Sequence, residues 1–244
     1  MSDGSNAVKA QSTRPAWHQD IARYAHADDR KAVWQLVNTL VPYLGLWILM
    51  VYTIEAGLPY WLTLSLAVVA AAFLVRIFIF FHDCCHGSFF SSPRANTALG
   101  YITGVATFTP FHAWQRSHAQ HHATAGNLDR RGFGDVWTMT VEEYEAAPRR
   151  TQLAYRLYRN PLVMFGLGPA SSFLIAQRFF PKGGKRRERV SVLVTNLAIL
   201  AIVVLASLTI GFWTYVLIQL PVILVAGALG IWLFYVQHQY EGVY

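Results

Sequence analysis

The sequence contains few charged side chains for its length. Asp, Glu, Lys and Arg make up 14% of the 244 residues, whereas hydrophobic residues make up 54%. A soluble domain is usually about 25% charged, so this composition argues against an ordinary soluble globular protein. The apolar residues also gather into runs that are long enough to cross a bilayer. These features predict a multi-pass membrane protein with a single membrane domain.

Cysteine is nearly absent as well. The two cysteines, Cys84 and Cys85, are adjacent, and neighbouring cysteines seldom pair, so a disulfide framework is excluded. Both thiols fit a reducing position that faces the cytosol. The start of the chain lacks the apolar core of a signal peptide. We therefore expect residues 1–32 to be a polar, largely disordered cytoplasmic tail and residues 33–244 to form the membrane domain.

Basic residues are missing from two short connections between apolar runs. All 20 Lys and Arg lie in residues 1–31, at Arg76, or in residues 94–189. In so apolar a chain, the net charge of +7 indicates the cytoplasmic side of a membrane rather than nucleic acid binding. The positive-inside rule then predicts that the N-terminus, the histidine-rich regions and the C-terminus are cytoplasmic.

Four apolar runs are predicted to span the membrane as helices, and two weaker runs are not. Residues 55–58 and 213–214 would join the four into two hairpins. The weaker runs are too short or too closely flanked by basic residues, so we expect helices in the inner interface or against the bundle. The predicted fold is therefore all-α and integral to the membrane, with a cytoplasmic histidine-rich cap. The spans are residues 33–54, 59–81, 190–212 and 215–237, and the weaker runs are residues 96–111 and 161–180.

Five of the nine histidines fall in two clusters. In the first, two histidines four positions apart lie on one face of a helix, where the second span leaves the bilayer. The second cluster has the spacing i, i+3, i+4, so its first and last imidazoles share a face. Chance surface histidines rarely repeat such spacings, and the clusters therefore predict a metal site. The clusters are His82 and His86, then His118, His121 and His122.

A sixth histidine lies at the matching membrane depth. His238 is at the inner end of the fourth span, level with His82. A zinc ion takes three or four ligands, so six imidazoles fit two metals better. Imidazole suits iron, zinc, copper and nickel, and oxidation of C–H bonds by O₂ requires a redox metal. We expect His112 to be a hydrogen-bonding neighbour rather than a ligand, and His18 and His26 to have no role in the site.

These motifs resemble those of the membrane fatty acid desaturases. The resemblance rests on residues 82–90 (HDCCHGSFF), 118–123 (HAQHHA) and 235–241 (YVQHQYE), and covers roughly residues 34–244. Residues 127–144 (NLDRRGFGDVWTMTVEEY) also resemble the stretch after the second histidine box. The similarity is closest to acyl-lipid desaturases of the Δ12/ω-6 group, of bacterial and plastid type.

The resemblance implies a site with two iron ions and O₂ as co-substrate. In the family the irons are held by three histidine boxes and one additional histidine. The third box, another HxxHH beyond the final span, is absent, so we expect the chain to be C-terminally truncated and to hold only part of the site. Carried over to this chain, the implied ligands are His82, His86, His118, His121, His122 and His238.

The implied reaction introduces a cis double bond into the acyl chain of a membrane lipid. The apolar bundle would form a narrow tunnel for that chain. Carboxylates behind the ligands would orient the imidazoles, and Asp83, Asp129 and Asp135 are the candidates. A helix cap or a salt bridge with Arg130 or Arg131 explains each of these carboxylates equally well.

The electron donor is expected to be a separate protein. The His-Pro-Gly-Gly haem motif of a fused cytochrome b5 domain is missing, and ferredoxin is the expected donor in place of cytochrome b5. The basic residues 182–189 could bind an acidic donor. Contact with anionic lipid headgroups explains the same residues and is the favoured interpretation.

Other functions fit parts of the pattern. Residues 82–86 (HDCCH) resemble the HExxH motif of a zinc hydrolase, which leaves the second histidine cluster unexplained. Related di-iron hydroxylases share the histidine boxes and differ in product, and an inactive membrane protein that only binds lipid is a further alternative. Two irons per protein would indicate a desaturase, whereas one zinc would indicate a hydrolase.

Overall fold

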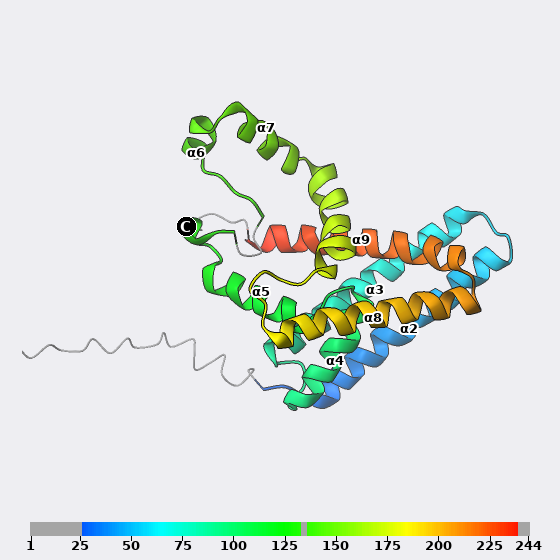
Figure 1. Ribbon diagram of the computed structural model, residues 1–244. Helices are drawn as coiled ribbons and strands as arrows, with labels where there is room; N and C mark the ends of the chain where they lie inside the picture. The colour runs from blue at the N-terminus through cyan, green and yellow to red at the C-terminus, as the bar shows by residue number, and fades with distance from the viewer. Residues whose placement is uncertain (1–25, 133–135, 239–244) are drawn as a thin grey trace, which may run out of the picture.

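The computed structural model describes residues 26–132 and 136–238, with the side chain of His238 excepted, and every regular element among them is a helix (Figure 1). The all-α prediction is therefore confirmed. In chain order the elements are α2 (Asp29–Glu55), α3 (Tyr60–His86), α4 (Pro93–Ala106), α5 (Phe111–Thr124), η1 (Leu128–Arg130), α6 (Val141–Ala146), α7 (Arg149–Tyr158), η2 (Val163–Leu167), η3 (Ala170–Ile175), η4 (Ala176–Arg178), α8 (Arg186–Thr209) and α9 (Phe212–His238).

Four of the described helices are long and apolar enough to cross a membrane, namely α2, α3, α8 and α9. With 24 to 27 residues each, they extend for about 36–40 Å, which exceeds a hydrocarbon core of about 30 Å. They form the two predicted hairpins, whose tips lie together at one end of the bundle (Figure 1). The chain is thus an integral membrane protein. Helix α2 begins at Asp29, inside the predicted tail, and residues 1–25 lie outside the described part.

The turn of the second hairpin differs from the sequence prediction. The break between α8 and α9 falls at Ile210 and Gly211, whereas we expected it at residues 213–214. Gly211 has a φ of 89°, a conformation that glycine adopts at little cost. The N–H groups of Ile210 and Gly211 both donate to the carbonyl of Ala206, which closes α8. The apolar residues Phe212 and Trp213 then continue into α9, because hydropathy alone does not locate a helix end.

Helix α3 lies at the centre of the bundle and packs against α2, α4 and α9. Its Ala70, Ala71 and Leu74 side chains are at most 1% exposed. Near the hairpin tip, the buried hydroxyls of Thr53 and Thr63 lie 2.9 Å apart and join α2 to α3. This central position fixes the place of the histidine-bearing end of α3 in the bundle.

Neither of the two weaker apolar runs is among the candidate spans found in the described residues. Helix α4 has 14 residues, or about 21 Å, and packs on α3 and α8. A Cβ atom on Gly100 would lie 2.2 Å from the ring of Phe111, so the glycine permits the close approach of α4 and α5. The second run is broken into the π-helical segments η2 and η3 and the short η4, and it packs against α9. Both histidine clusters therefore lie on the same side of the bundle.

Candidate metal centre

The end of α3 presents the first pair of histidines. His82 and His86 are one helical turn apart, and the helix stops immediately after His86. Gly87 follows in the left-handed conformation, with a φ of 70°. Its N–H donates to the carbonyl of Cys84, and the N–H of Ser88 donates to the carbonyl of Asp83. This pair of bonds is a Schellman motif, which fixes the last turn of α3 and with it the direction of the histidines.

Helix α5 brings the second pair, His118 and His122, to the same place. Its first turns are tied to α8, because the N–H of Ala113 donates to the Ser191 hydroxyl at 3.2 Å and Arg116 pairs with Glu188 at 2.8 Å. Toward α3, the Trp114 ring lies edge-on to the ring of Phe81, with centroids 5.1 Å apart. The Trp114 ring stacks on His118 with centroids 4.1 Å apart. Trp114 lies four residues before His118, so helical spacing alone could have indicated its place beside the site.

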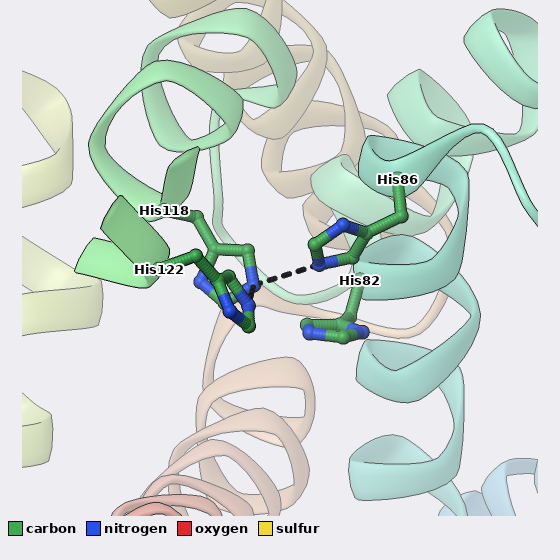
Figure 2. Close-up of side chains that lie close together, drawn as sticks. All are labelled: His82, His86, His118 and His122. Atoms are coloured by element: carbon green, nitrogen blue, oxygen red, sulfur yellow. Dashed lines mark hydrogen bonds between the residues drawn. The ribbon is translucent and has the colours of Figure 1, made fainter. Parts of the chain in front are cut away.

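Four imidazoles converge between α3 and α5 (Figure 2). One ring nitrogen from each residue lies within 4.8 Å of those of the other three: His82, His86, His118 and His122. We call these residues the four-histidine group. The two boxes predicted from sequence therefore meet in space, although 31 residues separate His86 from the next member of the group.

The geometry of this group fits a bound metal ion. The Nε2 atom of His118 lies 3.0 Å from Nε2 of His86 and also 3.0 Å from Nε2 of His122. A ring nitrogen carries either one hydrogen or one lone pair, so it cannot make two such hydrogen bonds at once. Two nitrogens that bind one metal at about 2.1 Å, at a right angle, would also lie about 3.0 Å apart. A shared cation thus explains both contacts.

Electrostatics keeps the central imidazole neutral. Burial, as the largest cause, and the neighbouring imidazoles of His82, His122, His86 and His121 together lower the pKa of His118 to about 3. A neutral imidazole is the form that binds a metal. His118 therefore does not have to lose a proton before the site binds a cation.

The carboxylate of Asp83 touches the group. Asp83 Oδ1 lies 3.0 Å from Nδ1 of His82, so it can accept the Nδ1 hydrogen and leave Nε2 free for a metal. Asp129 lies exposed on η1, and its backbone N–H donates to the side chain of Asn127. Asp135 lies outside the described residues.

The four-histidine group does not include His121, and it was defined among residues whose side chains are described, which leaves out His238. His121 is 3% exposed, and its ring lies against Phe234 of α9 with centroids 5.0 Å apart. Its centroid is 6.1 Å from that of His118, so it borders the group without joining it. His238 ends α9, and its side chain lies outside the described part of the structure.

His112 is hydrogen-bonded at both ring nitrogens, as expected for a neighbour of the site. Its Nδ1 lies 3.1 Å from Oε1 of Gln115, and its Nε2 accepts from Nε of Arg187 at 2.8 Å. Gln115 was not predicted, and Arg187 was predicted only as part of the basic residues 182–189, since no spacing in the sequence marks either residue as a partner of His112.

A cavity of about 310 Å³ adjoins the four-histidine group. It lies between α3, α5, η3 and α9, and its walls are mostly apolar. His118 belongs to this wall as well as to the four-histidine group, so the cavity ends at the candidate metal centre. The remaining lining residues include Leu74, Phe78, Trp114, His121, Phe173, Ile223, Gly230 and Phe234.

Residues 58–244 match the family model of the fatty acid desaturases. The chain belongs to this family. A fatty acid desaturase of Bacillus subtilis is 51% identical over 226 residues, which are 93% of this chain and 64% of the relative. An omega-3 fatty acid desaturase of Caenorhabditis elegans is 28% identical over 57% of this chain and 36% of its own length.

A third relative is the sn-1 acyl-lipid omega-3 desaturase (ferredoxin) of Synechocystis, 29% identical over 52% of this chain and 35% of its own length. This chain thus spans just under two thirds of the B. subtilis relative and about a third of the other two. The predicted family is confirmed. The closer similarity to the Δ12/ω-6 group stays a prediction.

Proposed function

We propose that this chain belongs to an O₂-dependent di-iron desaturase that introduces a cis double bond into the acyl chain of a lipid. The observation that carries the proposal is the double position of His118, which is part of the four-histidine group and of the cavity wall. A metal held by these imidazoles would face the cavity directly. An apolar substrate in the cavity would then lie beside a redox metal, which is what oxidation of an unactivated chain requires.

The cavity suits an acyl chain in size and in chemistry. Its volume of about 310 Å³ is within the range of ligand pockets, which begins near 300 Å³. Leu74, Phe78 and Ile223 provide apolar contact and exclude water. Phe173 packs near Gly227, since a Cβ atom there would lie 3.4 Å from its ring. The residues of η3 and α9 would therefore hold a chain against the histidines.

The ligands of the two irons are proposed to be His82, His86, His118, His121, His122 and His238. Bound iron would supply the oxidation by O₂, which with two electrons and two protons converts two neighbouring methylenes into a double bond and yields two waters. The imidazoles would hold the metals, and Asp83 would orient His82 by accepting its Nδ1 hydrogen. Asp129 and Asp135 remain proposed supports for the site.

We also propose that the four-histidine group faces the cytoplasm, together with both ends of the chain. The distribution of Lys and Arg supports this orientation, since the hairpin tips carry none. Electrons would come from a separate acidic carrier of the ferredoxin type. Arg116 and Arg187 border a pocket that reaches His86 and His118, and their positive charges would offer an acidic donor a place to dock.

The test is lipid analysis of a host that makes only saturated and monounsaturated lipids. The gene that encodes this chain is expressed, and fatty acid methyl esters are profiled by mass spectrometry alongside a His118→Ala variant. New double bonds with the wild type alone would support the proposal, together with about two irons in the purified protein. A hydroxylated product would indicate the related hydroxylases, and one bound zinc would indicate a hydrolase. Unchanged lipids with a folded, iron-loaded protein would overturn the proposal.

A further inference from the structure

A chain of hydrogen bonds joins α8, α5 and α3 beside the four-histidine group. Nε of Arg187 donates to Nε2 of His112 at 2.8 Å, and Nδ1 of His112 lies 3.1 Å from Oε1 of Gln115. Nε2 of Gln115 donates to the backbone carbonyl of Cys85 at 2.8 Å. The chain therefore starts on the N-terminal turn of α8 and ends on the last turn of α3, one residue before His86.

The direction of every bond in this chain is fixed by its first member. An arginine has no acceptor, so Nε2 of His112 must accept and the ring hydrogen must sit on Nδ1. Oε1 of Gln115 then accepts from Nδ1, which turns the amide nitrogen of Gln115 toward Cys85. Because His112 is only 6% exposed, water has little access to replace these partners.

The last bond acts at the point where α3 needs it. The final carbonyls of a helix lack partners within the helix. The carbonyls of Asp83 and Cys84 accept the two hydrogen bonds of the Schellman motif. The carbonyl of Cys85 accepts a hydrogen bond from the side chain of Gln115. Elsewhere between the two helices, Phe81 of α3 meets Phe111 and Trp114 of α5 through ring contacts, which set distance less sharply than a directed hydrogen bond does.

We propose that Gln115 is a positioning residue that sets the separation of the two histidine pairs, with its side chain oriented by His112 and Arg187. Gln115 lies one turn before His118 on α5 and bonds to α3 one residue before His86. Its hydrogen bond thereby connects the last turn of α3, which carries His86, to the part of α5 that carries His118. This role rests on the proposed metal centre and extends it to residues that do not bind metal.

Metal affinity tests the proposal, because simple electrostatics predicts the opposite sign. Gln115→Glu is nearly isosteric and keeps the acceptor for His112, but it replaces the donor to Cys85 with a carboxylate oxygen. Added negative charge near a site should tighten binding of a cation. Loss of positioning should instead weaken it, by about tenfold or more on the scale of other supporting residues of metal sites.

The measurement is titration of the purified, metal-free protein with Co²⁺, a redox-stable substitute for Fe²⁺, followed by absorbance. Gln120→Glu is the matched control, since it adds the same charge to an exposed position of the same helix. We expect it to bind Co²⁺ as tightly as the wild type or more tightly. Gln115→Met, which adds no charge, should weaken binding as Gln115→Glu does, with an unchanged helical circular dichroism spectrum.

Arg187→Met completes the test. Removing a positive charge should by itself tighten Co²⁺ binding. Losing the hydrogen bond from Arg187 to His112 should instead weaken Co²⁺ binding, by less than the Gln115 variants do. In a Gln115→Met background, Arg187→Met should cause no further weakening. Nitrogen NMR of the metal-free wild type should show His112 protonated at Nδ1, and Arg187→Met should lose this preference.

Equal or tighter Co²⁺ binding by Gln115→Glu would overturn the positioning role and leave the metal centre standing. His112 protonated at Nε2 in the wild type would also overturn it. A wild-type protein that binds no Co²⁺ would overturn the metal centre and the positioning role together, so the two failures can be told apart.

Discussion

Helices α3 and α9 have the same length, 27 residues, and lie against each other in the bundle, yet they contribute in different ways. Helix α3 is closely packed along its length, with Ala67, Ala70 and Leu74 at most 1% exposed. Helix α9 begins with similar packing, where Ile218 and Val222 are fully buried. Farther along, α9 borders the cavity that leads to the histidines.

The difference lies in what the small residues of each helix face. The alanines of α3 bring neighbouring helices close and leave no room. In α9, a Cβ atom at Gly227 would meet Pro169 at 2.8 Å, whereas one at Gly230, a turn later, would meet nothing within 4 Å. A metal centre needs ligands that do not move, and a substrate needs space. Close packing in α3 and an open glycine in α9 satisfy these two needs next to each other.

The largest expected effect comes from His118, which belongs both to the four-histidine group and to the wall of the cavity. His118→Ala should lower metal affinity by more than about 100-fold and abolish desaturation, because it removes a ligand rather than a residue that supports one. Metal content of the purified protein and lipid profiles measure both. The exposed His26→Ala should change neither. A His118→Ala protein that still loads metal normally would contradict the assignment of this residue.

Filling the cavity should change which acyl chains are converted and leave the metal content of the protein unchanged. Gly230→Leu puts a side chain into open space that faces the acyl site, so long acyl chains should be converted about 10-fold less well than short ones. Metal content should stay at the wild-type level. Gly45→Leu is the control, since it also has open space around it but lies exposed on α2, away from the cavity. An unchanged profile of acyl-chain lengths in Gly230→Leu would show that the acyl chain of the substrate does not occupy this cavity.

Lowering the pH should destabilise the metal-free protein through His118. Its pKa is lowered to about 3 when folded, from an ordinary value of 6.5, so folding disfavours the protonated form. The associated stability is complete above about pH 6.5 and is lost as the pH falls from there toward 3. One proton limits the slope to about 1.4 kcal/mol per pH unit. Thermal unfolding of the metal-free protein between pH 7 and pH 5 should show a weaker dependence in His118→Asn, and an identical dependence would argue against this origin.

The smallest effect is expected at the far end of α3. Thr53→Val removes the hydroxyl that bonds to Thr63 and should destabilise the hairpin by about 0.6 kcal/mol, the average for such bonds in membranes. The double variant with Thr63→Val should recover part of this loss, because no hydroxyl is then left without its partner. Unfolding in mixed micelles measures both, with the exposed Thr209→Val as control. A loss of several kcal/mol would show that packing near the tip depends on this bond far more than expected.

Much of the metal centre could be predicted because helical spacing is local. His82 and His86, like His118 and His122, lie one turn apart in any α-helix, so each pair shares a face whatever the fold. The spans followed from length and hydropathy, and the basic residues excluded a span at residues 161–180. The turn at Gly211 was missed, because the apolar run continues past it and only the backbone conformation marks the end of α8.

The separation of His121 from the four-histidine group could not be predicted. It lies next to His122 in sequence, but its side chain leaves the helix about 100° away and packs on Phe234 of α9. Which neighbour it meets depends on where α9 lies, and nothing near His121 in the sequence specifies that. The same holds for Gln115, whose partners come from α3 and from His112, itself oriented by α8.

By itself, the sequence determined that this is a helical membrane protein and that each of two histidine pairs lies on one face of a single helix. Apolar length and a four-residue spacing act within one segment, so both can be read along the chain. Only the tertiary structure decided that the two pairs meet, that Gln115 links their helices, and that an open space ends at His118. These features depend on distances between separate helices, which are set by packing across the whole bundle.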